Sequence, residues 1–230
     1  MQLVLLTALL AGGGTADAEP GFDNAADAAA VIAPQLQTGT LIFSEGDCLA
    51  IKAYSAGPFT HVAAVVIRGD EPWVYDSMNG VGVRKLTLER YLASQVPDEI
   101  HLFHPSRRLT DEESRELETA LEDRLGTPYA VMHHVTGNRS EKGVHCAEYV
   151  TDALMSVGLI RAERPPKVSP ASLAEGITKN EIYTNGVTIQ VARPEPTPPD
   201  DASWCGRMWF DTKLCCTRCC DQLTGWFLCR

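Results

Sequence analysis

Three neighbouring segments constrain the fold most, because each has the pattern of a β-strand and only tight turns separate them. Residues 59–67 form an almost continuous apolar run, Phe-Thr-His-Val-Ala-Ala-Val-Val-Ile, which is typical of a buried strand. Residues 73–77 and 81–86 follow as a second and a third strand, and Asn79-Gly80 between them is a strong hairpin signal. The sequence therefore predicts an antiparallel meander of these strands.

The rest of the pattern predicts helices and further strands on either side of this meander. Thr110 with Glu113 forms a capping box, the clearest helix start in the chain. Asn185-Gly186, between β-prone residues, predicts a small hairpin, whereas Pro165-Pro166 and Pro170 exclude helix from their stretch. We also expect strands at residues 40–43 and 100–104, and helices at residues 25–32, 87–93, 110–125 and 146–157.

Cys146 stands at the start of a segment with the apolar spacing of a helix. Apolar residues recur at Ala147, Val150, Leu154 and Val157, a period of about 3.6 residues. Unpaired backbone N–H groups and the positive end of the helix dipole would then point at the sulfur and favour the thiolate, which is the nucleophilic form. The alternative is an unreactive buried residue, because free cysteine is among the most buried residue types.

His61 and Asp76 are the candidate partners of this cysteine. His61 interrupts an apolar strand, where an imidazole costs free energy unless it is hydrogen-bonded. Asp76 lies on the next predicted strand, so the two side chains come close if the register allows, and the carboxylate would fix the imidazole tautomer. The alternatives are a core histidine bonded to a backbone carbonyl and an aspartate at a strand end that faces water.

The other five histidines fit a catalytic role less well. His145 adjoins the cysteine, but consecutive residues of a helix face apart. His133 and His134 fall in an irregular segment and could line a substrate cleft. His101 and His104 are expected on an edge strand, where two residues three apart point to opposite faces and make a poor metal site. No cofactor or metal ion is expected.

Composition places the chain among globular proteins and bounds its partners. The 230 residues, 44% of them hydrophobic, can bury one sizeable core. The formal net charge of −10 argues against nucleic acid or an anionic membrane surface as the main partner.

The chain divides into four parts. Residues 1–18 hold a short apolar run that ends in the small-x-small pattern Ala16-Asp17-Ala18, and they are predicted to be a signal peptide, although no Lys or Arg precedes the run. Residues 19–193 form the catalytic domain, residues 194–202 a Pro-rich linker and residues 203–230 a Cys-rich tail. We expect an exported protein, periplasmic or extracellular; the alternatives are a misplaced start codon and a flexible apolar N-terminus.

The tail holds most of the cysteines. In an exported protein, six clustered cysteines predict three disulfides in a segment too short to have a core of its own. The alternative is a metal site, because Cys216 and Cys219 form a C-x-x-C pair. Either module could attach the protein to the cell envelope. Cys48, in the body, is interpreted as a small buried hydrophobe. The six tail cysteines are Cys205, Cys215, Cys216, Cys219, Cys220 and Cys229.

Histidine, acid and cysteine follow one another along the chain in an order that resembles the permuted papain-like hydrolases of the NlpC/P60 superfamily, specifically the YaeF/YiiX group of amidases. The resemblance covers about residues 36 to 175 and includes Pro170-Ala171-Ser172-Leu173 after the cysteine helix. The tail lies outside it. The other matching segments are Leu36-Gln37-Thr38-Gly39-Thr40-Leu41-Ile42-Phe43, Phe59-Thr60-His61-Val62, Val74-Tyr75-Asp76, Gly82-Val83, Gly126-Thr127-Pro128-Tyr129 and His145-Cys146-Ala147-Glu148-Tyr149-Val150.

The resemblance implies an α+β, circularly permuted papain-like fold, with an antiparallel sheet packed on the helix that bears the nucleophile. It implies Cys146 as nucleophile, His61 as base and Asp76 as the orienting group, although relatives often carry Glu or His in the third place. The implied function is a cysteine hydrolase that cleaves an amide or peptide bond, possibly of the cell wall, through a thioester. The alternatives are a lipid acyl hydrolase or acyltransferase of the same fold and an inactive envelope binding protein.

Overall fold

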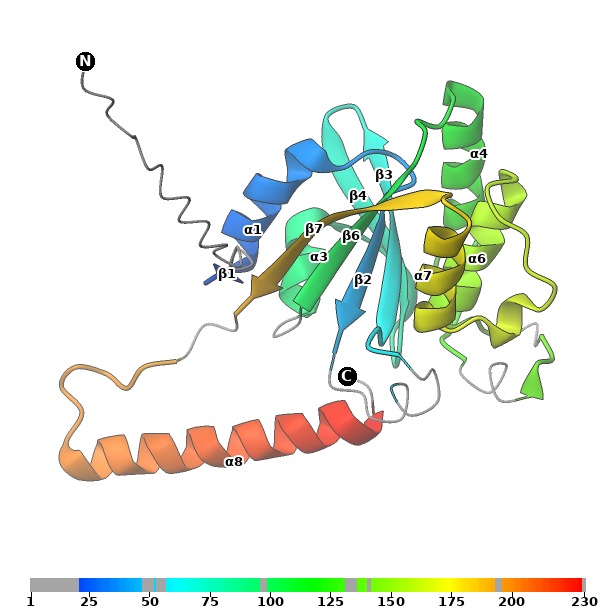
Figure 1. The fold of residues 1–230 in the computed structure, drawn as a ribbon. Coiled ribbons are helices and arrows are strands. Elements are labelled where there is room, and N and C mark those ends of the chain that lie inside the picture. The colour runs from blue at the N-terminus through cyan, green and yellow to red at the C-terminus, as the bar shows by residue number, and fades with distance from the viewer. Residues whose placement is uncertain are drawn as a thin grey trace, which may run out of the picture.

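The protein is described from a computed structural model, which covers residues 21–46, 52, 57–95, 99–130, 136–139, 142–192 and 196–228. Within these residues, seven strands form one sheet in the order β1-β7-β6-β2-β3-β4-β5 (Figure 1). All neighbouring strands are antiparallel except β1 and β7, which are parallel. The strands are β1 (Gly21–Phe22), β2 (Leu41–Glu45), β3 (His61–Arg68), β4 (Glu71–Met78), β5 (Gly82–Thr87), β6 (Glu99–Pro105) and β7 (Tyr183–Val191).

Helices cover both faces of the sheet, so the domain has three layers and two apolar cores (Figure 1). One core joins the sheet to α4, α6 and α7, and the other joins it to α1 and α3. The sheet alternation assigns each residue to one core, since Val62 and Ala64 of β3 lie in the first and Ala63 and Val65 in the second. The helices are α1 (Ala25–Ile32), α3 (Leu88–Ser94), α4 (Asp111–Glu122), α6 (Cys146–Ser156), α7 (Pro170–Lys179) and α8 (Trp204–Leu228).

The structure confirms the predicted meander and most predicted helix starts. Strands β3, β4 and β5 pair in sequence as antiparallel neighbours. Asn24 caps α1, and Thr110 with Glu113 forms the capping box of α4. That helix ends at Glu122, however, so the predicted extension is wrong and Leu125 is 42% exposed.

Three local predictions are wrong. Residues 183–191 form one continuous strand, not a hairpin, since β7 pairs along β6 and Gly186 leaves room for the His104 ring. Pro170 does not exclude a helix; it occupies the first turn of α7, where a proline needs no N–H partner. Strand β6, which carries His101 and His104, lies inside the sheet between β7 and β2, not at an edge.

The tail differs from the prediction as well. Residues 204–228 form the single helix α8, and five of the tail cysteines are free and exposed, whereas Cys229 lies outside the described residues. The described tail cysteines therefore form none of the predicted disulfides. On a helix, neighbouring side chains three or four residues apart have Cβ atoms about 5–6 Å apart, further than a disulfide allows. The described part of the tail also contains no group of three ligands that could hold a metal ion.

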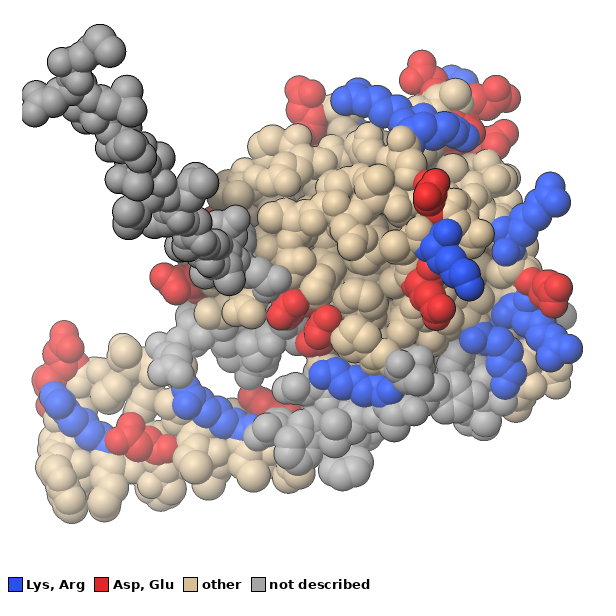
Figure 2. Space-filling model, in the orientation of Figure 1, with Lys and Arg blue, Asp and Glu red and all other residues tan. Residues whose placement is uncertain are grey.

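The surface shows no strong separation of charge on the face seen in Figure 2, where acidic and basic side chains are intermixed. No helix in the described part of the chain is both long enough and apolar enough to span a membrane. Cys48, His133 and His134 lie outside the described residues.

Candidate active site

The candidate nucleophile is the first residue of α6, as the sequence predicts. Cys146 is free, is only 2% exposed and lies at the end of the helix where backbone N–H groups have no intrahelical partner. The helix buries nearly its whole first two turns against the sheet, which holds the sulfur in a defined position. The N–H groups of this turn are available to a negatively charged oxygen bound beside the sulfur.

His145 is the N-cap of this helix, a role that the sequence analysis missed. Its Nδ1 accepts a hydrogen bond from the backbone N–H of Glu148 at 3.3 Å, and its Nε2 lies 3.0 Å from the carbonyl oxygen of Pro166. Burial would lower the pKa of His145, but its interactions with Cys146, the Pro166 carbonyl and Glu148 raise it. Histidine is an unusual cap, so the common capping residues gave no signal for it.

The segment that leads into the nucleophile is tied to the sheet. Ser77 of β4 donates from its hydroxyl to the carbonyl oxygen of Val144 at 2.8 Å, and the N–H of Val144 donates to Pro128. Gly82 lies against Thr127, which precedes Pro128, because a Cβ atom on Gly82 would lie 2.4 Å from the Thr127 carbonyl oxygen. These contacts place Cys146 relative to β4 and β5 before the helix begins.

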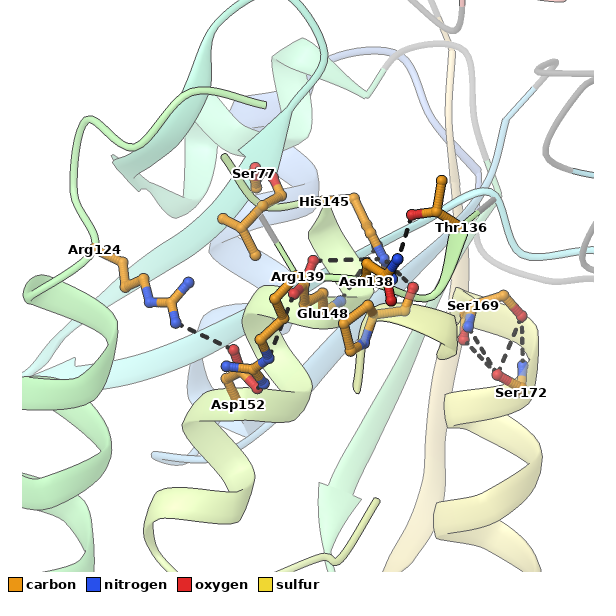
Figure 3. Close-up of polar contacts among 12 residues, drawn as sticks. Ser77, Arg124, Thr136, Asn138, Arg139, His145, Glu148, Asp152, Ser169 and Ser172 are labelled. Carbon is orange, nitrogen blue, oxygen red and sulfur yellow. Dashed lines mark hydrogen bonds and ion pairs between the residues drawn. The ribbon is translucent and has the colours of Figure 1, made fainter. Parts of the chain in front are cut away.

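Charged contacts also anchor the helix along its exposed side (Figure 3). Arg124, after the end of α4, and Arg139, in the segment before α6, both bind the carboxylate of Asp152. Glu148, one turn nearer the start of the helix, is buried and lies 3.9 Å from both Arg139 and His145. The two arginines therefore join three separate segments around the nucleophile helix.

His61 and Asp76 form the pair that the sequence predicts. Nε2 of His61 lies 3.1 Å from Oδ2 of Asp76, and both residues are buried. The imidazole also interacts with the Cys146 side chain, and this interaction raises the pKa of His61 and lowers that of Cys146. The three predicted residues are thus brought together in one chain of contacts.

Strand alternation alone would separate this histidine from this cysteine. His61 has the same alternation as Ala63 and Val65, which face the core of α1 and α3, and it stacks on Tyr91 of α3. Cys146 belongs to the other core. His61 is the first residue of β3, and at this end of the strand it interacts with Cys146 although the two residues belong to different cores.

Arg84 completes the site and was not identified from the sequence. From β5 it donates to Asp76 through Nε at 2.7 Å to Oδ1 and through Nη2 at 3.0 Å to Oδ2. Asp76 and Arg84 are directly opposite residues of β4 and β5. The signal was available, because opposite charges facing each other across a hairpin attract, but it requires the register.

The charges in the site favour an ion pair between sulfur and imidazole. Burial alone would raise the pKa of the Cys146 thiol, but the charge of His61 and hydrogen bonds with His145 and His61 lower it to about 6. Burial would lower the pKa of His61, but the charge of Cys146 and the contact with Asp76 raise it to about 10. Between these values, the thiolate and the imidazolium stabilise each other.

The pKa of Asp76 is lowered although its burial opposes this, because His61 and Arg84 both donate to the carboxylate. A buried aspartate that stays ionised can hold the imidazolium in place.

Tyr129 also lies close to the sulfur. Burial raises the pKa of its phenol, and the charge of Cys146 raises it further, so the group stays protonated and can donate a hydrogen bond. The remaining described histidines, His101 and His104, lie elsewhere on the sheet and contact Thr188 and Thr40.

One comparison with known proteins identifies the family of this chain. A comparison with curated proteins found no significant match. Among solved structures, the metalloprotein YiiX of Escherichia coli O157:H7 is similar, with 19% identity, 67% of this chain and 89% of that chain covered, and a TM-score of 0.48. The model of the permuted papain-like amidase enzymes, YaeF/YiiX, C92 family, matches residues 35–184. This match covers more than half of the 230 residues, so the protein belongs to the YaeF/YiiX family of permuted papain-like amidases.

Proposed function

We propose that the protein is a cysteine hydrolase that cleaves an amide or peptide bond through a thioester, with Cys146 as nucleophile, His61 as base and Asp76 as the orienting group. The observation that supports this most is the contact chain from Cys146 through His61 to Asp76 at the start of a buried helix. A thiol, a base and a group that orients the base are what covalent catalysis by cysteine requires.

In the first half of the reaction, the Cys146 thiolate attacks the carbonyl carbon and a carbon–sulfur bond forms. The carbonyl oxygen becomes negative, and the backbone N–H of Cys146 stabilises it. The intermediate then collapses, the carbon–nitrogen bond breaks, and the His61 imidazolium gives its proton to the departing amine. A thioester on Cys146 remains.

In the second half, His61 is neutral and can act as a base again. It removes a proton from a water molecule, which attacks the thioester carbon. The carbon–sulfur bond breaks, the acid leaves, and the thiolate and imidazolium are restored. Asp76 keeps the imidazole oriented in both halves, and Arg84 holds Asp76.

We further propose an exported protein that acts on a small envelope substrate, with a cell-wall peptide as the first choice. The support is the N-terminal sequence pattern and the acidic charge, which disfavours nucleic acid. The tail is proposed as an attachment segment, since α8 presents Trp204, Met208 and Trp209, more than half exposed, beside its free cysteines.

The test is to incubate the protein with cell-wall peptides and, separately, with phospholipid vesicles, and to identify the products by mass spectrometry. We expect a released amine from the peptides and an acyl adduct on Cys146. The Cys146→Ser variant should lose both, and the matched tail variant Cys205→Ser should keep both. Release of fatty acid alone would indicate a lipid acyl hydrolase. No turnover, together with no labelling of Cys146 by a thiol-reactive probe at neutral pH, would indicate a binding protein.

A further inference from the structure

A second group of polar side chains lies on the sheet outside the candidate active site. Glu45 ends β2, Glu99 begins β6, and the two residues are directly opposite each other in the antiparallel pair. His101 lies two residues after Glu99 and therefore on the same face of β6. One ligand atom from each of the three lies within 4.8 Å of the other two.

Two carboxylates directly opposite on neighbouring strands repel each other, so the arrangement calls for a positive charge between them. The side chains are only partly exposed, 28% for Glu45 and 31% for Glu99, so water screens this repulsion incompletely. Gln190 of β7 donates to Glu99 at 3.5 Å, but an amide is neutral and leaves the two negative charges in place.

His101 supplies the second and independent observation. Its Nε2 atom is buried and lies 3.2 Å from Oε1 of Glu45 and 3.0 Å from Oε1 of Glu99, yet it forms a properly aligned hydrogen bond with neither. Two carboxylate oxygens are therefore close to a buried nitrogen that neither of them satisfies. Three atoms bound to one metal ion at about 2.0–2.1 Å would be spaced about 2.9 Å apart in octahedral geometry and about 3.3 Å in tetrahedral geometry. The two observed spacings fall in this range.

The other ring nitrogen of His101, Nδ1, has a hydrogen-bond partner, as is usual for metal-binding histidines. Nδ1 lies 3.1 Å from the hydroxyl of Thr188 on β7, and the ring of Phe59 packs edge-on against it with centroids 5.0 Å apart. When Nδ1–H donates to Thr188, the lone pair of Nε2 is directed at the two carboxylates. A second-shell partner of this kind fixes the tautomer and orientation of a ligand.

We propose that Glu45, Glu99 and His101 form a binding site for one divalent transition-metal ion. The donor set of two carboxylates and one imidazole suits ions such as Mn²⁺, Fe²⁺ or Zn²⁺ and leaves coordination positions for water. The ion would link the ends of β2 and β6. Ser44, next to Glu45, is paired with His61, so the site stabilises the strand end beside the candidate catalytic histidine without contacting the reacting atoms.

Mn²⁺ is the probe of choice, because carboxylate ligands suit it and the thiols of Cys146 and the tail suit softer ions. Binding to the full-length protein is measured by the loss of the free-ion signal in electron paramagnetic resonance. We expect one ion per chain, and at least about tenfold weaker binding for Glu45→Gln, Glu99→Gln and, through the second shell, Thr188→Val. Glu71→Gln, which removes the same charge from an exposed strand position, should bind like the wild type.

A thermal measurement distinguishes a metal site from an ion-pair cluster that needs no metal. For a metal site, Mn²⁺ raises the melting temperature of the wild type, and Glu45→Gln removes this rise while making the metal-free protein no less stable. For an ion-pair cluster, Glu45→Gln lowers the melting temperature and Mn²⁺ has no effect. The result described for an ion-pair cluster would overturn the proposal. So would absence of Mn²⁺ binding at 1 mM, a concentration on the order of the dissociation constant of a weak site, and so would equal binding by Glu45→Gln and the wild type.

Discussion

Arg84 holds both carboxylate oxygens of Asp76, at 2.7 Å and 3.0 Å, while His61 contacts one of the same oxygens at 3.1 Å. The carboxylate is therefore shared between a permanent cation and the candidate catalytic base. Because Arg84 keeps Asp76 ionised, it acts on the sulfur through two intermediates and is a positioning residue, not a catalytic one. This relationship leads to the first prediction.

Replacing Arg84 by methionine should narrow the pH range of activity. The pKa of Asp76 would rise, the carboxylate would stabilise the imidazolium less, and the pKa of His61 would fall from about 10. The pKa of Cys146 would rise from about 6, because it depends on the charge of His61. We expect the acid limb of the kcat/KM profile to move up and the alkaline limb to move down. At the optimum, kcat/KM should fall about tenfold, which corresponds to the free energy that a hydrogen bond to a charged group contributes.

Arg90→Met is the control for this variant, since Arg90 is exposed on α3. Its profile should match that of the wild type. An unchanged profile for Arg84→Met would show that Asp76 is held without Arg84.

Thiol reactivity gives a direct measure of the ion pair. The rate of Cys146 alkylation, followed by peptide mass spectrometry, should rise with pH through an inflection near 6, whereas ordinary thiols titrate at about 8.5. His61→Gln should move the inflection upward, because burial then dominates and favours the neutral thiol. The exposed tail cysteine Cys205 in the same sample serves as the internal reference. An inflection of Cys146 that coincides with that of Cys205 would rule out the ion pair.

Loss of the proposed base should nearly abolish turnover. We expect His61→Ala to lower kcat by at least about 10³-fold, as in other nucleophile–base pairs. His104→Ala is the comparison, because His104 lies on β6 and its ring contacts the Thr40 hydroxyl at 3.0 Å, away from the candidate active site. Similar activity of His61→Ala and the wild type would exclude His61 as the base.

His145 should contribute to stability through its capping role. His145→Ala removes the acceptor for the Glu148 N–H and should cost about 1 kcal/mol of unfolding free energy, a fall of about 2–4 °C in melting temperature for a chain of this size. Asparagine is a good capping residue, so His145→Asn should restore most of the loss. Equal destabilisation by both substitutions would mean that the contact with Pro166, not the cap, is the important one.

Comparing alanine substitutions at two glycines distinguishes the stability lost through backbone strain from the stability lost through steric overlap. Gly69 (φ +63°) and Gly82 (φ +92°) both have positive φ, but a Cβ atom meets nothing within 4 Å at Gly69 and the Thr127 carbonyl at 2.4 Å at Gly82. Gly69→Ala should therefore cost about 1–2 kcal/mol. Gly82→Ala should cost more and should displace the loop that leads to Cys146. Chemical denaturation measures both values, and equal costs would show that the loop yields freely.

Local sequence patterns determined much of the secondary structure of this protein and the positions of the three candidate catalytic residues. Apolar runs and the Asn79-Gly80 turn predicted the β3–β5 meander, and Thr110 with Glu113 predicted the start of α4, because these signals act over a few residues. Cys146 was correctly placed at the first turn of a helix for the same reason. His61 and Asp76 were found because polar residues in an apolar setting need partners, and the structure gives them each other.

Only the tertiary structure decided the rest, because the remaining interactions join residues whose neighbourhood depends on register and on the ends of the sheet. Pairing along β6 kept Asn185-Gly186 extended. The contact of Asp76 with Arg84 follows from the β4–β5 register. His61, at the start of β3, interacts with Cys146, which belongs to the opposite core. A local sequence pattern specifies which face of a strand a residue occupies and where a turn lies, whereas contacts between different cores depend on how the whole sheet and its helices are packed.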